Sequence, residues 1–179
     1  MSRTIKRRVG VSGLVAAAAL TVLGGNVAMA DTAAAAPPPE VSNAEWFDAA
    51  CTVPPDRDLN VTTRIYQIAT QRQVTPKVLL SAFEAGWVES HMHNLNCGDR
   101  DSLGVFQQRP SQGWCDNPAD CLNVDHATNA YLDQAIPNDL KTPGFSAGQL
   151  AQSVQRSAYP ERYDQAQAKA QQMIAEVRG

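Results

Sequence analysis

The stretch TPKVLLSAFEAGWVES, residues 75–90, is a strong helix signal, and the rest of the chain can be placed around it. Thr75 has the side chain of a good N-cap. Pro76 suits the first helical position, where a backbone N–H would lack a partner. We therefore predict a helix that begins at Pro76 and reaches Glu89 or Ser90. From residue 94 to residue 123 the helical periodicity disappears, and Gly, Pro, Asn, Asp and Cys recur. That segment is expected to form a loop with turns, or a small hairpin.

Helix start signals also occur on both sides of this stretch. They are two capping boxes (residues 42–45 and 146–149), two N-caps (Asn60 and Asp125) and one proline (Pro160). Pro137 is expected to end the helix that Asp125 opens, because proline disrupts a helix interior. Apolar residues recur on one face of these helices: Trp46, Phe47 and Ala50; Val61, Ile65, Ile68 and Ala69; Ala127, Ala130, Tyr131 and Ala135; Leu150 and Val154; Tyr163, Ala166, Ala170, Met173, Ile174 and Val177. The predicted fold class is mainly α, a helical bundle with a long loop after the third helix.

The N-terminal part of the sequence has the features of an exported protein. Residues 1–30 combine a basic start, a short apolar segment (9–23) and an A-x-A cleavage site (28–30), which is typical of a signal peptide. The apolar segment is too short and too rich in glycine for a membrane span, so we expect no membrane attachment after cleavage. Residues 31–40 form an Ala/Pro-rich linker, and residues 41–179 are enough for one domain.

The charge balance excludes one class of partner. Residues 1–30 carry four of the fifteen Lys and Arg residues and none of the eighteen Asp and Glu residues, so the mature chain has a net charge of −7. A chain with this balance has no basic patch that could offset phosphate repulsion, which argues against nucleic acid as a partner. We expect a secreted monomer.

All four cysteines lie in the exported part, and their even number indicates two disulfides. Three pairings are possible. We expect Cys115–Cys121 together with Cys51–Cys97, because the first pair closes a short local loop.

Two glutamates of the 75–90 helix, Glu84 and Glu89, lie closest to the long loop. They are five residues apart, so at about 100° per residue they point roughly 140° away from each other. Glu89 leans toward small apolar neighbours at the helix end, whereas Glu84 shares its side with Lys77 and is expected to be solvated. Partial burial and the negative end of the helix dipole would both raise the pKa of Glu89. A general acid that works near neutral pH requires that shift.

Glu89 and the loop that follows it resemble a known protein family. The pair Glu89-Ser90, followed after a loop by GVFQ (residues 104–107), resembles the E-S … G-L-M-Q pattern of lytic transglycosylases in the lysozyme-like superfamily. The longer run GDRDSLGVFQQRPSQGW (residues 98–114), with residues 129–130 and 154–157, is similar to a secreted Gram-positive branch of that group. The resemblance covers about residues 74 to 163, and the loop run at its distance after the pair is its specific part.

The resemblance implies an α-rich, lysozyme-like α+β domain whose cleft binds the GlcNAc–MurNAc strands of peptidoglycan. It also implies that the secreted protein is associated with the cell wall. Glu89 would protonate the leaving glycosidic oxygen, and the muramic 6-hydroxyl would then close onto C1 to give a 1,6-anhydro product. That route needs one carboxyl group and no cofactor. Candidate substrate-binding residues are Ser90, Ser102, Gly104, Gln107, Gln108, Arg109, Trp114 and Gln155. Gln107 is the strongest of them. Trp114 would stack on a sugar ring or pack on the neighbouring disulfide.

Two alternatives stay open at this point. Asp99 or Asp101 could activate a water across the cleft from Glu89, which would make the reaction an inverting hydrolysis, or both could form an internal ion-pair and turn set with Arg100. The family pattern also has a Tyr-Asn pair where this chain has Val154 and Gln155, which permits a glycan-binding or structural protein without activity.

A metal site is also conceivable, at His91, His93 and Cys97. It has no H-E-x-x-H helix, and Cys97 is better explained as a disulfide partner, so we expect no metal.

Overall fold

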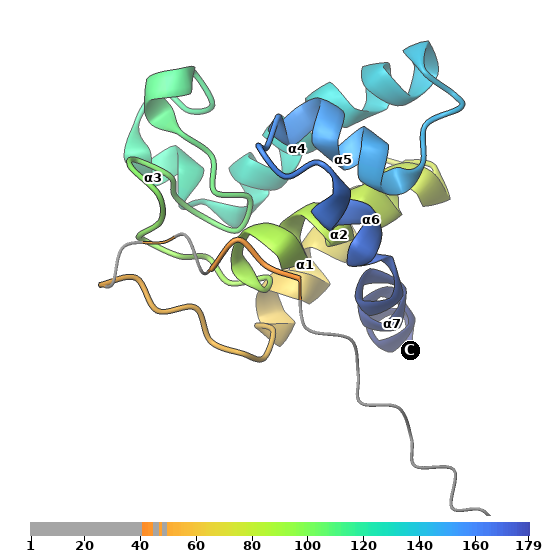
Figure 1. The fold of residues 1–179 in the computed structure, drawn as a ribbon. Helices are drawn as coiled ribbons and strands as arrows, with labels where there is room; N and C mark the ends of the chain where they lie inside the picture. The colour runs from red at the N-terminus through yellow and green to blue at the C-terminus, as the bar shows by residue number, and fades with distance from the viewer. Residues whose placement is uncertain (1–40, 45–46, 48–49) are drawn as a thin grey trace, which may run out of the picture. The chain divides into compact units, whose positions relative to one another are not determined.

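The computed structural model describes residues 41–44, 47 and 50–179, which form a helical domain (Figure 1). The predicted signal peptide and linker lie outside the described residues, as does most of the predicted helix after the 42–45 capping box. The elements are α1 (Leu59–Gln71), α2 (Pro76–Ser90), the 3-10 turn η2 (Pro110–Gln112), α3 (Pro118–Cys121), α4 (Val124–Lys141), α5 (Ala147–Gln155), α6 (Glu161–Gln165) and α7 (Gln167–Arg178). No strand occurs in this part of the chain, and none of these helices is long and apolar enough to cross a membrane.

Helix α2 is the centre of the domain. It begins as predicted: the Thr75 side chain accepts a hydrogen bond from the backbone N–H of Val78, and Pro76 occupies the first turn. It ends at Ser90, where His91 takes a left-handed conformation. Because α1, α4, α5, α6 and α7 all contact it, α2 is buried on nearly every side. The expected solvated face is therefore wrong, and Glu84 is fully buried.

Four helix boundaries differ from the prediction, and three of them lie at helix starts or at the division of a helix. Asp58 caps α1 in place of Asn60, and Asn123 caps α4 in place of Asp125. In both helices the true cap lies two residues earlier, and its side chain accepts the backbone N–H of the residue that we had expected to be the cap. The predicted last helix is divided at Ala166 into α6 and α7.

Helix α4 does not end at Pro137 but continues to Lys141. The missing N–H leaves the carbonyl of the exposed Asp133 without its usual helical donor, a loss that solvent can compensate. Beyond the proline, Asp139 accepts a hydrogen bond from Thr75 at 3.0 Å and pairs with Lys77 at 2.6 Å. These contacts hold the end of α4 against the start of α2. They stabilise the helical turn after Pro137 and offset the cost of the proline.

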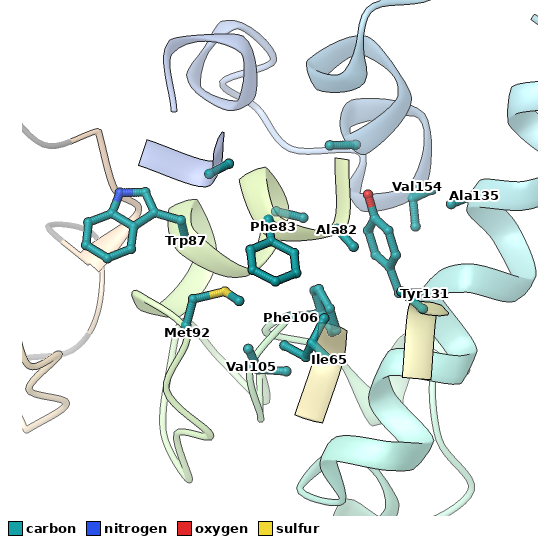
Figure 2. Close-up of a cluster of buried hydrophobic side chains, with 14 of the residues drawn as sticks. Ile65, Ala82, Phe83, Trp87, Met92, Val105, Phe106, Tyr131, Ala135 and Val154 are labelled. Atoms are coloured by element: carbon teal, nitrogen blue, oxygen red, sulfur yellow. The ribbon is translucent and has the colours of Figure 1, made fainter. Parts of the chain in front are cut away.

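The loop between α2 and α4 contributes Val105 and Phe106 to the core. It contains η2, α3 and one isolated bridge between Leu103 and Gln108, which takes the place of the possible hairpin. Val105 and Phe106 insert between α1, α2 and α4 (Figure 2), and the Phe106 ring stacks on Tyr131 with a centroid separation of 4.8 Å. Both predicted disulfides, Cys51–Cys97 and Cys115–Cys121, are confirmed. The loop is therefore held at a defined position relative to the end of α2.

Candidate active site

Glu89 lies in the last turn of α2, and only 8% of it is exposed. Its carboxyl group is held from two sides. The Tyr163 hydroxyl of α6 donates to Oε1 at 2.5 Å, and the Asn43 side-chain amide donates to Oε2 at 3.1 Å. A carboxyl group with both oxygens engaged keeps one orientation, as a group that must transfer a proton to a fixed point requires.

Asn43 belongs to the segment that precedes the helices, and several contacts fix it beside α2. Its backbone N–H donates to the carbonyl of Val88 at 2.7 Å. Arg162 donates to the side-chain oxygen of Asn43 at 3.0 Å and to the carbonyl of Ser42 at 2.6 Å. Because the Asn43 oxygen accepts from a guanidinium, its NH₂ group is left to face Glu89. The N-terminal segment thus supplies an oriented donor to the site.

Burial raises the pKa of Glu89 above its usual range, because a carboxylate loses hydration there. Hydrogen bonds from Tyr163, Asn43 and Gln155, and the charge of Arg162, act in the opposite direction. The same burial, with Glu89 beside it, raises the pKa of Tyr163 well above its ordinary value, so its hydroxyl stays a donor. The carboxyl group of Glu89 therefore holds a proton more readily than an exposed glutamate does, and its carboxylate is still stabilised by hydrogen bonds after the proton is lost.

Two cavities meet at Glu89, with volumes of about 200 Å³ and about 480 Å³. Phe47, Ser102 and Tyr159 line the smaller cavity and do not line the larger one. Residues that line both cavities are Asn43, Glu89, Asp99, Gln107, Ser157 and Ala158. Glu89 therefore faces the junction of a continuous cleft that runs between the loop at 98–114 and the segment after α5.

Seven of the predicted site residues line this cleft with Glu89: Asp99, Ser102, Gln107, Gln108, Arg109, Trp114 and Gln155. Ser90 and Gly104 do not; they shape the loop. The Ser90 hydroxyl donates to the carbonyl of Val105 at 2.7 Å. Gly104 has a φ of 76°, and a Cβ there would lie 2.1 Å from the carbonyl oxygen of Cys121, so no larger residue fits.

Gln107 is positioned by the loop backbone. Its side-chain NH₂ donates to the carbonyls of Cys97 at 3.2 Å and Gly104 at 3.1 Å. A Cβ at Gly98 would lie 1.8 Å from its side-chain oxygen, which explains the glycine. That oxygen is buried and accepts no hydrogen bond from the described residues. Gln108, in contrast, donates to the carbonyl of Ala127 at 3.0 Å and chiefly joins the loop to α4.

The two loop aspartates have different surroundings. Asp101 accepts the backbone N–H of Ser111 at 2.8 Å and pairs with Arg109 at 2.7 Å, and these contacts hold its pKa well below the ordinary range. It does not line the cleft. Asp99 does, with a side chain that is 62% exposed and 3.9 Å from Arg100. Of the two, Asp99 is the carboxylate that shares a cavity with Glu89.

Sequence reasoning missed Tyr163 and Asn43. Tyr163 was assigned to the core, and it is fully buried, but its hydroxyl reaches Glu89. Val154, which stands where the family pattern has tyrosine, is a buried core residue, while the neighbouring Gln155 lines the cleft and donates to the carbonyl of Phe106 at 2.9 Å. No sequence pattern indicated that Asn43, which lies 46 residues before Glu89, would reach the site.

The histidines at the loop start face the segment after Cys51. His91 contacts the carbonyl of Pro54 at 2.9 Å, and His93 contacts that of Asp56. Within the described ranges, no three His, Cys, Asp or Glu side chains gather as a metal site would need. No protein-family model matches the chain, and a search of curated proteins finds no match.

Proposed function

We propose that this protein is a secreted, cell-wall-associated enzyme that cleaves the MurNAc–GlcNAc bond of peptidoglycan, with Glu89 as the general acid and base. The proposal includes a lysozyme-like domain that acts as a monomer on glycan strands. The observation that carries it is the state of Glu89: a buried carboxyl group with a raised pKa, bound at both oxygens and open to a cleft. A merely structural glutamate would not need that opening.

In the proposed reaction, the protonated Glu89 donates its proton to the glycosidic oxygen as the bond to C1 breaks. The resulting carboxylate then accepts the proton of the muramic 6-hydroxyl while that oxygen bonds to C1. The proton therefore returns to Glu89, and the products are a 1,6-anhydro end and a free 4-hydroxyl. Tyr163 and Asn43 donate to the carboxylate in the interval between the two transfers.

The lytic route is favoured over hydrolysis because Asp101 is occupied by Arg109 and Ser111. The specific observation in favour of hydrolysis is Asp99, which lines the same cavities as Glu89 and could orient a water. An inverting hydrolysis would need about 6.5–9.5 Å between the two carboxyl groups and would leave a reducing end.

The test is digestion of purified peptidoglycan with the mature protein, followed by mass analysis of the fragments. We expect 1,6-anhydro ends from the wild type and from Asp99→Asn, and no cleavage by Glu89→Gln. The matched control is Glu161→Gln, which removes an exposed carboxylate from α6. Reducing ends that vanish in Asp99→Asn would establish hydrolysis. Binding without any cleavage by the wild type would establish the glycan-binding alternative, and cleavage by Glu89→Gln would refute the role of this residue.

A further inference from the structure

The larger cavity carries a concentration of positive charge. Fifteen Lys and Arg residues occur in the chain, four of them in the first thirty positions, and three of the remaining eleven line this one cavity: Arg100, Arg109 and Arg156. Lysine and arginine do not line the smaller cavity, whose described lining includes Phe47 and Tyr159. Three arginines at one cavity are unusual in a mature chain whose net charge is negative, and such a group attracts a negatively charged ligand.

The three arginines are not equally compensated. Asp101 neutralises Arg109 at 2.7 Å. Arg156 donates to the side-chain oxygen of Gln134 at 2.9 Å, an uncharged partner, and no described carboxylate lies within 4.0 Å of it. Arg100 is 70% exposed and reaches Asp99 only at 3.9 Å. Arg156 and, in part, Arg100 therefore leave donors and positive charge available to a ligand.

The backbone supports the same interpretation. Six non-glycine residues of the described chain have a positive φ, and three of them line this cavity: Arg100 at 56°, Gln107 at 48° and Arg156 at 56°. A left-handed conformation is disfavoured for residues with a Cβ and recurs at ligand sites. Arg156 is the C-cap of α5, a position where a left-handed residue is usually glycine. Arginine at that position brings a cation to the cleft that glycine would not.

We propose that the larger cavity binds a carboxylate carried by the glycan strand, through Arg156 and Arg100. This inference rests on the proposed function and assigns an orientation to the substrate. In peptidoglycan only the muramyl sugar bears a carboxylate, either the free lactyl group or the carboxylates of the stem peptide attached to it. The muramyl residue then occupies the larger cavity, and the uncharged N-acetylglucosamine occupies the smaller one beside Tyr159.

The experiment measures binding in the Glu89→Gln background, so that no ligand is consumed. Three ligands of equal length are compared: a neutral chitooligosaccharide, a muramyl strand stripped of its peptides, and a strand that keeps its stem peptides. We expect Arg156→Gln to weaken binding of carboxylate-bearing strands about tenfold and Arg100→Gln about threefold, with neutral binding changed less than twofold. A loss confined to the stripped strand identifies the lactyl carboxylate, and a loss confined to the other identifies the stem peptide.

The control is Arg178→Gln, which removes the same charge from the exposed end of α7 and should leave all three affinities unchanged. Equal losses for neutral and carboxylate-bearing ligands, or equal effects of Arg178→Gln and Arg156→Gln, would overturn the inference. If Arg156→Gln does not fold, Arg100→Gln decides alone, because its exposed side chain is not needed for packing. Failure of the proposed function appears separately, as absence of cleavage by the wild type, and leaves this binding comparison intact.

Discussion

The surroundings of Glu84 and Glu89 show how one helix can hold two buried carboxyl groups with different capacities. Both lie in α2, five residues apart, and both are buried. Glu84 is fully enclosed, and neither of its oxygens accepts a hydrogen bond from the described residues. Glu89 receives hydrogen bonds at both oxygens and faces a cleft.

Helices α5 and α6 both contact α2, the helix of Glu84, and they also pack against each other. A Cβ at Gly148 would lie 2.4 Å from atoms of Asp164, so the two helices touch closely there. Burial, with the negative charge of Asp164 as a second cause, raises the pKa of Glu84 to about 8. At neutral pH this side chain is thus mostly a neutral carboxylic acid without access to a substrate. Burial raises the pKa of both carboxyl groups, but only Glu89 also has the hydrogen-bond donors and the opening to a cleft that the proposed catalysis requires.

The largest expected effect separates the two residues by activity. Glu89→Gln should lower kcat/KM for peptidoglycan cleavage by at least about a thousandfold, because it removes the transferable proton. Glu84→Gln, measured on the same substrate at pH 6, should change it less than twofold, because a neutral amide replaces a neutral acid of the same shape. Equal losses of activity in two variants that both stay folded by circular dichroism would contradict the distinction between Glu89 and Glu84.

Tyr163→Phe should have the next largest effect, a loss of about 30-fold in kcat, because it removes a hydrogen bond to a charged group. It should also move the pH profile. The hydroxyl of Tyr163 lowers the pKa of Glu89 by stabilising its carboxylate, so its removal raises that pKa further. The alkaline limb, where the protonated acid is lost, should therefore shift to higher pH. An unchanged limb with reduced kcat would mean that Tyr163 acts only by packing.

Between pH 5 and pH 8, the difference in free energy of unfolding between Glu84→Gln and the wild type should change by an amount on the order of 3 to 4 kcal/mol. Below pH 4.5, the ordinary value, Glu84 is protonated in both folded and unfolded chains. Between pH 4.5 and about 8 the unfolded chain releases this proton and the folded chain keeps it, so the wild type loses stability as pH rises. The variant lacks that loss. Urea unfolding at pH 5 and pH 8 should show that the variant becomes more stable relative to the wild type as the pH rises. If the free energy of unfolding changes with pH equally in both proteins, the pKa of Glu84 is not raised and its carboxyl group is hydrated.

Local signals predicted much of the fold, and for physical reasons. The Thr75-Pro76 start and the capping box at residues 146–149 act within one helical turn, so neighbouring residues suffice to identify them. The two disulfides also followed from spacing and compartment. Glu84 was misassigned because helix α2 is surrounded by five others, and helical periodicity describes one exposed face that this helix does not have.

The candidate site was predictable only where its residues are close in sequence. The loop at 98–114 is continuous, and its polar composition marked it. Tyr163 reaches Glu89 across 74 residues and Asn43 across 46, and both contacts arise from the packing of separate elements. A tyrosine on an apolar stripe looks like a core residue, and Tyr163 is one as well. Such a double role is visible only after the helices are assembled.

Asn43→Ala should give the smallest effect, a three- to tenfold loss of kcat. Its hydrogen bond to Glu89 is longer than that of Tyr163, 3.1 Å against 2.5 Å, and it too lowers the pKa of the carboxyl group. The alkaline limb should move upward, but by less than in Tyr163→Phe. Asn43→Asp sharpens the test: a carboxylate facing Glu89 should raise its pKa further while keeping the contact with Arg162. If both variants match the wild type in kcat and pH profile, the N-terminal segment contributes nothing to the difference between Glu89 and Glu84.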